Sequence, residues 1–359
     1  MIDSTKNSIN DYAVVDLFCG VGGLTHGFVK EKFDVVAGID FDGTCKYAFE
    51  KNNKTTFLHR DITKVTSKEI EELYPKEKRK ILVGCAPCQP FSIYTNIKKE
   101  KSDDEKWKLL YEFSRVIKDL QPDIISMENV PQLEKFENGK VLKDFIAALK
   151  EEKYFVKYKI VNAQNYGVPQ RRKRLILFAS KYGEVEILNE THNSENYVTV
   201  KDAIGNLPPI EDGVHHPEDK LHFARELTPK NKLRIRATKE GGSWKDWSED
   251  LVLDCHKKES GKSFGSVYGR MVWNDVSPTL TTYCVGLGNG RFGHPEQHRA
   301  LSLREAAILQ SFPKNYDFID KSVEFSSAKI ARQIGNAVPV GLGVMIAKSI
   351  KNHLKNNLK

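Results

Sequence analysis

The sequence predicts an α/β fold, with one large domain on a parallel β-sheet that helices cover on both faces, and a smaller, irregular second domain. Two observations predict it. In the first half, short apolar runs typical of buried strands alternate with amphipathic stretches. After residue 180 this rhythm stops, and residues 183 to about 290 carry several Gly and Pro residues instead. The strand-like runs are 12–18, 34–40, 80–85, 123–129 and 174–180.

Helix-like spacing of apolar residues separates and follows these runs. Leucine, isoleucine, valine and phenylalanine recur on one helical face in 106–120 and in 141–149. Beyond the irregular region a regular pattern returns in 301–312 and in a closing helix near 340–354. Because ligands bind at the carboxyl ends of the strands in such sheets, the turns after the strand-like runs are the places to search for a site.

Composition excludes several classes of protein. With 40% hydrophobic and 29% charged residues, the 359-residue chain is typical of globular rather than disordered proteins. A net charge of +8 fits a nucleic-acid partner, although many proteins without one are equally basic. No apolar run approaches the roughly 20 residues that span a bilayer, and the polar N-terminus lacks the apolar core of a signal peptide. Six scattered cysteines favour a reducing cytoplasm over a disulfide framework.

Three strand ends indicate an adenosine pocket. The first run ends in a glycine turn formed by Gly20, Gly22 and Gly23. This turn lets a ligand approach the backbone, but Thr25 breaks the dinucleotide-binding spacing G-x-G-x-x-G. Asp40 ends the next run, where an acid takes ribose hydroxyls, and Asp61 follows the next apolar stretch, where it would accept from an adenine amino group. An adenosine site without a phosphate site indicates S-adenosylmethionine.

Cys85 and Cys88 stand three positions apart in the stretch GCAPCQPFS, residues 84–92. A zinc site needs a second ligand pair, and the nearest candidate, Cys255 with His256, is distant and has adjacent rather than spaced ligands. A redox pair would leave the following Gln-Pro-Phe-Ser and the adenosine pocket without a role. A single nucleophile at Cys88, with Cys85 as an ordinary buried residue at the strand end, explains more of the surroundings.

Charged residues at two other strand ends complete the candidate site. Glu128 ends the strand predicted beside that of Cys88, and burial after an apolar run would raise its pKa. The cationic run PQRRKR, residues 169–174, precedes the last strand-like run. Without further context this run fits a solvated face or a phosphate contact.

Taken in order, these motifs closely resemble those of the cytosine-C5 DNA methyltransferases, in particular the single-chain bacterial modification enzymes. They are DLFCGVGG, GIDFD, RDI, GCAPCQPFS, ENV, QNYGVPQRRKR, RALSLREAAILQSFP and QIGNAVP. The resemblance covers residues 13–180 and roughly 277–350, and the ordered combination is highly specific. It implies a Rossmann-like, S-adenosylmethionine-dependent methyltransferase domain with a smaller, irregular target-recognition domain.

The resemblance implies four catalytic residues. Cys88 matches the nucleophile, whose thiolate adds to cytosine carbon 6 and activates carbon 5. Glu128 matches the acid that contacts cytosine N3, Arg174 the arginine on the O2 side, and Arg172 its companion near the nucleophile. Because the cytosine edge is inaccessible in a stacked duplex, this chemistry implies base flipping. By the same resemblance, the charged segment 93–106 is expected to be a loop that closes over the DNA.

The implied cofactor is S-adenosyl-L-methionine, with S-adenosyl-L-homocysteine as its product and no metal. Asp40 stands where many relatives carry Glu, a side chain longer by one methylene. The residues expected to line the cofactor pocket are Phe18, Gly20, Gly22, Gly23, Asp40, Phe41, Asp61, Ile62, Asn336 and Val338.

Double-stranded DNA is the implied partner. Trp244 and Trp247, in the irregular region, either contact DNA or pack the small domain. The candidate DNA contacts are Gln89, Ser92, Gln170, Arg234, Arg236 and Arg270.

The resemblance also predicts a discontinuous catalytic and cofactor-binding domain, 1–182 plus 331–359, and a smaller domain, 183–330, that contains the recognition region. The expected setting is a monomer in the bacterial cytoplasm or nucleoid, away from membranes, with a separate restriction endonuclease as partner. One alternative is a tRNA cytosine-C5 methyltransferase of the same fold, but that branch typically has a Cys-Phe-Thr element after ENV, where this chain has PQLEKFENG. The other, a non-catalytic DNA-binding member, would lack the nucleophile.

Overall fold

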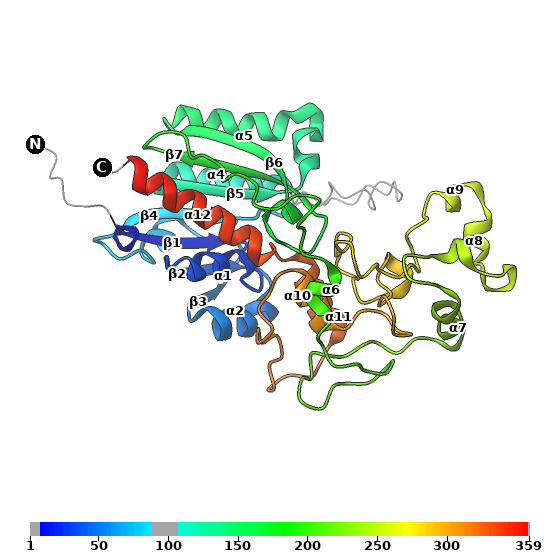
Figure 1. Cartoon of the computed structure of the whole chain (residues 1–359). Helices are drawn as coiled ribbons and strands as arrows, with labels where there is room; N and C mark the ends of the chain where they lie inside the picture. Colours follow the sequence, from blue (N-terminus) through cyan, green and yellow to red (C-terminus); the bar gives the residue numbers. More distant parts are fainter. Residues whose placement is uncertain (1–7, 88–106, 358–359) are drawn as a thin grey trace, which may run out of the picture. The chain divides into compact units, whose positions relative to one another are not determined.

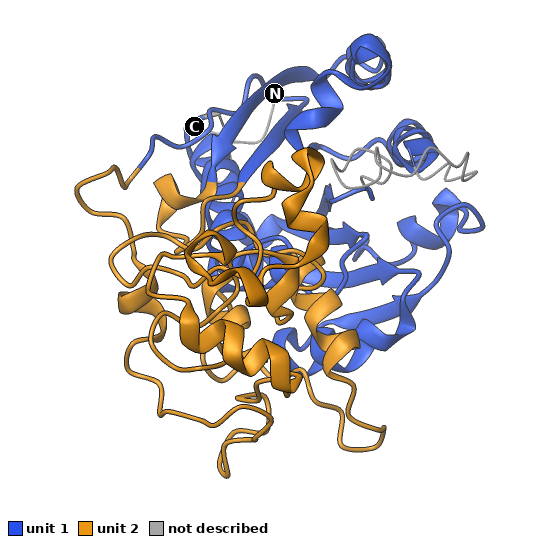
Figure 2. Ribbon diagram, turned by 90° about the vertical axis from the view of Figure 1, so that its right-hand side faces the viewer, with its two compact units in different colours: residues 1–162, 173–190, 338–359 blue, residues 163–172, 191–337 orange. Residues whose placement is uncertain are grey.

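The computed structural model describes residues 8–87 and 107–357 of the chain, which falls into two compact units (Figure 2). Unit 1 comprises Met1–Asn162, Lys173–Glu190 and Val338–Lys359, and unit 2 comprises Ala163–Arg172 and Thr191–Ala337. Relative to the predicted boundaries, residues 163–172 and 331–337 lie in the second unit, and residues 183–190 lie in the first.

Unit 1 is built on a seven-stranded sheet with the order β3-β2-β1-β4-β5-β7-β6 (Figure 1). Its strands are β1 (Tyr12–Leu17), β2 (Asp34–Asp40), β3 (Thr56–His59), β4 (Arg79–Gly84), β5 (Ile124–Asn129), β6 (Phe155–Asn162) and β7 (Lys173–Ser180). β3, β2, β1, β4 and β5 pair in parallel, whereas β7 and β6 are antiparallel to their neighbours. The predicted α/β class and all five predicted strands are confirmed. The sheet is mixed rather than wholly parallel, and β3 and β6 were not predicted.

Helices cover both faces of this sheet because successive side chains of each strand point to opposite faces. Leu17 of β1 belongs to a core cluster that contains Phe113 of α4 and Phe145 of α5. The preceding residue, Asp16, points the other way and accepts a hydrogen bond from Thr25 of α1. The helices of unit 1 are α1 (Gly23–Lys30), α2 (Lys46–Asn53), α3 (Ser67–Glu71), α4 (Lys108–Leu120), α5 (Lys140–Glu151) and α12 (Val340–Asn357).

Helix α12 packs closely against α1. A Cβ atom built on Gly27 of α1 would lie 2.3 Å from the carbonyl carbon of Gly343 in α12, so only glycine permits this approach. The stretch Ser327–Asn356, which includes most of α12, is long and apolar enough to cross a membrane by length and composition alone. Within the protein, 72% of its apolar window is buried, which is the pattern of a core helix.

Unit 2 contains short helices joined by long irregular segments, and its described β-structure consists of isolated bridges. A buried ion pair lies in its core, where the Arg299 Nη2 atom is 2.7 Å from Glu305 Oε1 and both side chains are 1% exposed. Burial by itself would raise the pKa of Glu305, but the hydrogen bonds and charge of Arg299 lower it to about 2. The helices are α6 (Val200–Ile204), α7 (Pro229–Ala237), α8 (Asp254–Lys257), α9 (Glu259–Lys262), α10 (Leu303–Leu309) and α11 (Ser327–Asn336).

Replacing Glu305 by Gln should destabilise unit 2 by about 3–5 kcal/mol, because the buried guanidinium of Arg299 loses its counter-charge. Urea unfolding followed by tryptophan fluorescence measures this change. Glu259→Gln is the matched control, since Glu259 forms an exposed ion pair with Lys262 that should contribute less than about 1 kcal/mol. Equal effects of the two substitutions would contradict the central role of the buried pair.

Candidate active site

The carboxyl ends of β1, β4 and β5 meet at one edge of the sheet. Leu17 pairs with Gly84, and Gly84 pairs with Met127, so β1 and β4 end level and β5 continues for two further residues to Asn129. Cys85 directly follows β4, and Glu128 is one residue beyond Met127. The pairing therefore brings Cys85 and Glu128, 43 positions apart in the chain, to neighbouring places.

Glu128 forms a buried ion pair with Arg174. Glu128 pairs with Ile176 across the antiparallel strands, so Arg174, two residues earlier on β7, is its diagonal neighbour on the same face. The Arg174 Nε atom lies 2.8 Å from Glu128 Oε1, and the two side chains are 12% and 2% exposed. The structure thus brings together two of the predicted catalytic residues.

Cys85 contacts the other oxygen of the same carboxylate. Its Sγ atom lies 2.7 Å from Glu128 Oε2, and the residue is half-buried rather than fully buried as the sequence interpretation expected. Sequence reasoning missed this contact, because it depends on the register between β4 and β5. Among the described residues, no group of three or more His, Cys, Asp or Glu side chains could hold a metal ion. Cys88, Gln89, Ser92 and the segment 93–106 lie outside the described residues.

The turn after β1 is held by the carboxylate of Asp40 at the end of β2. Asp40 Oδ2 accepts a hydrogen bond from the backbone N–H of Gly20, and Oδ1 accepts one from that of Asp42, both at 2.8 Å. Gly20 and Gly22 have φ values of 51° and 84°, in the region that favours glycine, and Phe18 also adopts a positive φ of 60°. Burial raises the pKa of Asp40, although its backbone hydrogen bonds oppose this rise.

The surroundings of this turn fit an adenosine group. A Cβ atom built on Gly20 meets no heavy atom within 4 Å, so a ligand can approach the backbone there. Phe41, beside Asp40, is 74% exposed, and a flat exposed ring next to a carboxylate suits a purine and its ribose hydroxyls. Asp61, predicted to meet the adenine amino group, contacts Thr63 in this structure. Its Oδ1 atom accepts hydrogen bonds from the backbone N–H and the hydroxyl of Thr63 at 3.0 and 2.8 Å.

The other predicted cofactor residues are spread over both units. Gly23 begins α1 and is buried, and Ile62, just after Asp61, is also buried. Val338 is buried where the chain re-enters unit 1, whereas Asn336 is exposed at the end of α11 in unit 2. The adenosine-like surroundings described above belong to unit 1 alone.

Arg172 and Gln170 lie in unit 2, and their side chains form hydrogen bonds with other residues of that unit. The Arg172 guanidinium donates to the carbonyls of Leu280 at 2.9 Å and of Gly335 at 3.2 Å. The side chain of Gln170 donates to Gln310 Oε1 at 2.9 Å and accepts from the N–H of Leu280 at 3.0 Å. A role of Arg172 beside the nucleophile, and of Gln170 at DNA, stays a prediction.

The geometry agrees with the comparisons to known proteins. Residues 12–352 match the family model of the C-5 cytosine-specific DNA methylases. The Type II methylase M.HgiDII of Herpetosiphon aurantiacus is 54% identical over 343 residues, which cover 96% of each chain. The chain belongs to the C-5 cytosine-specific DNA methylase family. It is thus an enzyme of the DNA (cytosine-5-)-methyltransferase class.

A second relative and a solved structure also match the chain. The Type II methyltransferase M1.HphI of Haemophilus parahaemolyticus is 30% identical over 94% of this chain and 86% of its own length. A solved structure of a putative DNA modification methyltransferase from an E. coli prophage superposes with a TM-score of 0.73 at 23% identity, covering 96% of this chain and 100% of its own. The structural match supports the Rossmann-like fold.

Two of the arginines predicted to contact DNA are buried inside unit 2 of the methylase. The Arg270 guanidinium donates to four backbone carbonyls and to the His298 ring, and burial lowers its pKa to about 10. Arg234 is 7% exposed and lies over the rings of Trp247 and Tyr268. This burial favours a packing role for both arginines over contact with DNA.

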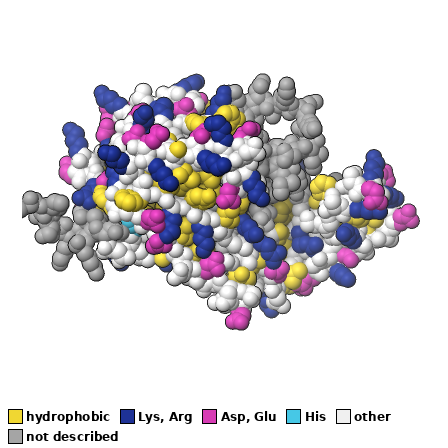
Figure 3. All heavy atoms as spheres, turned by 90° about the horizontal axis from the view of Figure 1, so that it is seen from above, with side chains coloured by type: hydrophobic (Ala, Val, Ile, Leu, Met, Phe, Trp, Pro, Cys, Tyr) yellow, Lys and Arg dark blue, Asp and Glu magenta, His cyan; other side chains and the backbone are white. Residues whose placement is uncertain are grey.

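The remaining candidates for DNA contact differ in how exposed their side chains are. Arg236 is exposed and stays a candidate for DNA contact. Trp244 and Trp247 are buried, and their indole N–H groups donate to the Phe264 carbonyl and the Thr238 hydroxyl, so the packing alternative holds for them. On the face shown in Figure 3, lysine and arginine side chains are interspersed with acidic ones, so charge alone does not mark a DNA-binding surface there.

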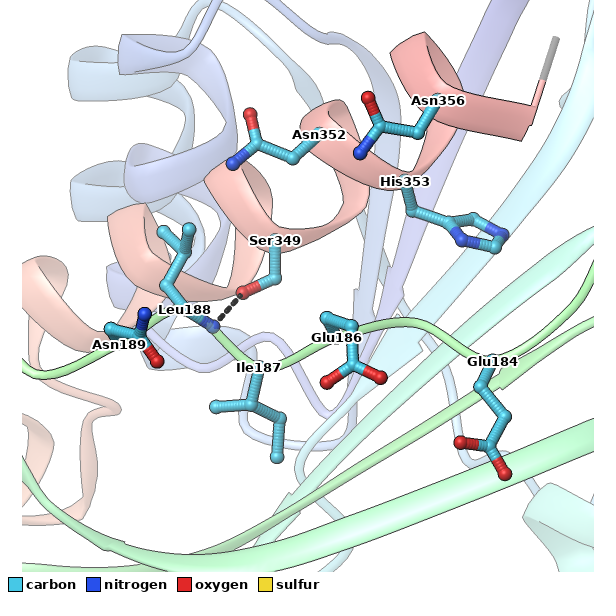
Figure 4. Close-up of a pocket in the computed structure, with 9 residues that line it drawn as sticks. All are labelled: Glu184, Glu186, Ile187, Leu188, Asn189, Ser349, Asn352, His353 and Asn356. Atoms are coloured by element: carbon cyan, nitrogen blue, oxygen red, sulfur yellow. Dashed lines mark hydrogen bonds between the residues drawn. The ribbon is translucent and has the colours of Figure 1, made fainter.

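A polar pocket of about 320 Å³ lies in unit 1, away from the candidate site. Glu184, residues 186–189 and the second half of α12 line it, and Figure 4 shows the Ser349 hydroxyl accepting a hydrogen bond from the backbone N–H of Leu188. The nearby Ser180 ends β7 and pairs with Ile124, the first residue of β5. The pocket therefore lies toward the amino edge of the parallel strands, opposite the edge that carries Glu128.

Asp16 is a buried carboxyl group that sequence reasoning did not single out. Its Oδ2 atom accepts a hydrogen bond from the Thr25 hydroxyl at 2.6 Å, and the residue is 1% exposed. Burial raises the pKa of Asp16 to about 7, a rise that the hydrogen bond from Thr25 only partly offsets. Asp16 is therefore protonated in the folded protein over a pH range in which it is ionised in the unfolded chain.

This difference predicts a pH-dependent stability that Asp16→Asn removes. Between about pH 4 and pH 7 the folded state binds more protons than the unfolded state, so the free energy of unfolding should fall as pH rises through this window. From pH 5 to pH 7.5 the wild type should lose about 2–3 kcal/mol relative to Asp16→Asn. Urea unfolding of both proteins at the two pH values measures the difference. Parallel pH profiles would contradict the raised pKa.

Proposed function

We propose that this methylase transfers a methyl group from S-adenosyl-L-methionine to carbon 5 of a flipped-out cytosine in a specific duplex DNA sequence. The observation that carries the proposal is the buried pair of Glu128 and Arg174 at the carboxyl edge of the sheet. It stands beside the segment that leads from β4 into Cys88. A carboxyl group that can donate a proton to N3 and a guanidinium that can donate to O2 suit this edge of a cytosine.

Each catalytic residue has a chemical task in this proposal. The Cys88 thiolate bonds to cytosine carbon 6, and the electron pair of the 5,6 double bond becomes available at carbon 5 for methylation. Glu128, as the protonated acid, gives its proton to N3 while Arg174 donates to O2, and together they offset the negative charge that develops on the ring, with Arg172 as their companion near the nucleophile. Removal of the carbon-5 proton by a base then restores the double bond and expels the thiolate.

The cofactor site of the proposal is the turn that Asp40 holds. When bound, S-adenosyl-L-methionine supplies an electrophilic methyl group and leaves as S-adenosyl-L-homocysteine. Asp40 takes the ribose hydroxyls, Phe41 packs against the adenine, and Asp61 meets its amino group. The supporting residues are Phe18, Gly20, Gly22, Gly23, Ile62, Asn336 and Val338.

The wider setting follows from the relatives. M.HgiDII and M1.HphI are both named Type II enzymes, and we propose a role in a restriction–modification system with a separate endonuclease. In this proposal unit 2 carries the target recognition, with Arg236 among its exposed basic residues. We expect a monomer that acts in the bacterial cytoplasm or nucleoid.

A covalent trap tests the proposal directly. Bisulfite sequencing of DNA from cells that express the protein identifies the target, and a duplex with 5-fluorocytosine at the modified position is then incubated with enzyme and S-adenosyl-L-methionine. Because fluorine cannot be removed as the proton is, the adduct should persist in denaturing gels and map to Cys88. Cys88→Ser should abolish the adduct. A bound donor without an adduct on any such duplex would overturn the proposal, and methylation of tRNA instead would assign the RNA-modifying activity.

Replacing Glu128 by Gln should lower kcat about 100-fold, because the group that offsets charge at N3 can no longer ionise or share a proton. The Kd for S-adenosyl-L-methionine should stay within twofold. Lys173→Gln is the matched control, since Lys173 precedes Arg174 on β7 but is exposed. Single-turnover methylation assays give the rates, and thermal unfolding verifies folding. Equal rates for Glu128→Gln and Lys173→Gln would exclude Glu128 from the reaction.

A further inference from the structure

The Glu128 carboxylate is held on both of its oxygens by groups from two different segments. Oε1 lies 2.8 Å from the Arg174 Nε atom on β7, and Oε2 lies 2.7 Å from the Cys85 Sγ atom just after β4. Because Glu128 is 2% exposed, water contributes little to fixing its orientation. With one partner per oxygen, rotation of the carboxylate about its terminal bond breaks at least one contact.

The backbone around Cys85 is fixed independently of its side chain. The Cys85 N–H continues the sheet by donating to the Leu17 carbonyl at 3.3 Å. On the far side of Glu128, the Asn129 side chain donates to the Ala86 carbonyl at 3.3 Å. The thiol is therefore presented to Glu128 by a segment anchored on both neighbouring strands, and a substitution at Cys85 should leave this backbone in place.

A thiol has a property that the second partner, Arg174, lacks. A guanidinium only donates hydrogen bonds, whereas the Cys85 sulfur is both a weak donor and a weak acceptor. The thiol can donate to Oε2 while Glu128 is ionised, and the sulfur can accept from Oε2 when Glu128 is protonated. The contact is thus compatible with both protonation states that an acid facing a ring nitrogen passes through.

We propose that Cys85 is a positioning residue that orients the Glu128 carboxyl group toward cytosine N3 in both of its protonation states. This inference rests on the proposed function, because it assigns Cys85 a task in the same reaction. It gives the second cysteine of GCAPCQPFS a role of its own, distinct from that of Cys88.

Kinetics of Cys85→Ala and Cys85→Ser test this role. Cys85→Ala should lower kcat about tenfold with KM for DNA and Kd for the donor within twofold, since a hydrogen bond to a charged group is lost. Cys85→Ser, which keeps a donor and acceptor, should recover kcat to within about threefold of the wild type. An unchanged kcat in Cys85→Ala, or a loss in Cys85→Ser as large as that in Cys85→Ala, would overturn the inference.

A double-mutant cycle separates action through Glu128 from a general structural role. In the Glu128→Gln background, Cys85→Ala should cost less than twofold in kcat, because the group that it positions is already gone. A full tenfold loss in that background would show that Cys85 acts elsewhere and would overturn the inference. Melting temperatures of all four proteins identify any variant that loses activity by unfolding.

A chemical readout remains available if the proposed methylation itself fails. In a Cys88→Ser protein, iodoacetamide should alkylate Cys85 slowly, because the Glu128 carboxylate disfavours the thiolate. Adding Glu128→Gln should accelerate alkylation of Cys85 at least fivefold, as followed by peptide mass spectrometry, with the exposed Cys255 as internal reference. Equal rates in the two proteins would show that the thiol and carboxylate do not interact, whatever reaction the enzyme catalyses.

Discussion

The register of β1, β4 and β5 at their carboxyl ends is the constraint on which the candidate site depends. Parallel pairing aligns Leu17, Gly84 and Met127, so the following positions carry Cys85 and Glu128 to one place. Since side chains alternate between the faces of a sheet, a slip of one residue would turn Glu128 to the opposite face. The ion pair on β7 and the thiol contact after β4 would then be lost together. The buried apolar strands, and not the polar residues themselves, therefore set the geometry of the site.

The carboxyl groups near this edge of the sheet each have a different kind of partner. Asp40 is held by backbone N–H groups, Glu128 by a guanidinium, and Asp16 by burial with a single hydroxyl partner. Each arrangement follows from what the neighbouring strand or turn offers: a glycine-rich loop presents N–H groups, and an antiparallel strand presents a diagonal side chain.

The sequence predicted the parts of this fold that repeat a local pattern. Apolar runs located β1, β2, β4, β5 and β7 to within one or two residues, and the ordered motifs identified the family. β6 was not predicted from the sequence because it is an edge strand with mostly half-buried or exposed residues and no continuous apolar run. The contact of Cys85 with Glu128 escaped because it depends on register between strands, which no local pattern encodes. The packing role of Arg270 was not predicted because most of its partners are backbone carbonyls, which every residue type carries and no sequence motif marks.

Because several arginines of unit 2 are buried, a basic residue in this unit does not by itself indicate a contact with DNA. An irregular segment leaves carbonyl groups without the partners that a helix or sheet would give them, and buried carbonyls need donors. The planar guanidinium supplies up to five N–H groups in a fixed fork, so one arginine can join several loops. Arg172, Arg234, Arg270 and Arg299 all donate to backbone carbonyls in this way. Part of the positive charge of the chain therefore holds unit 2 together, and the candidates for DNA contact in this unit are the residues that, like Arg236, remain exposed.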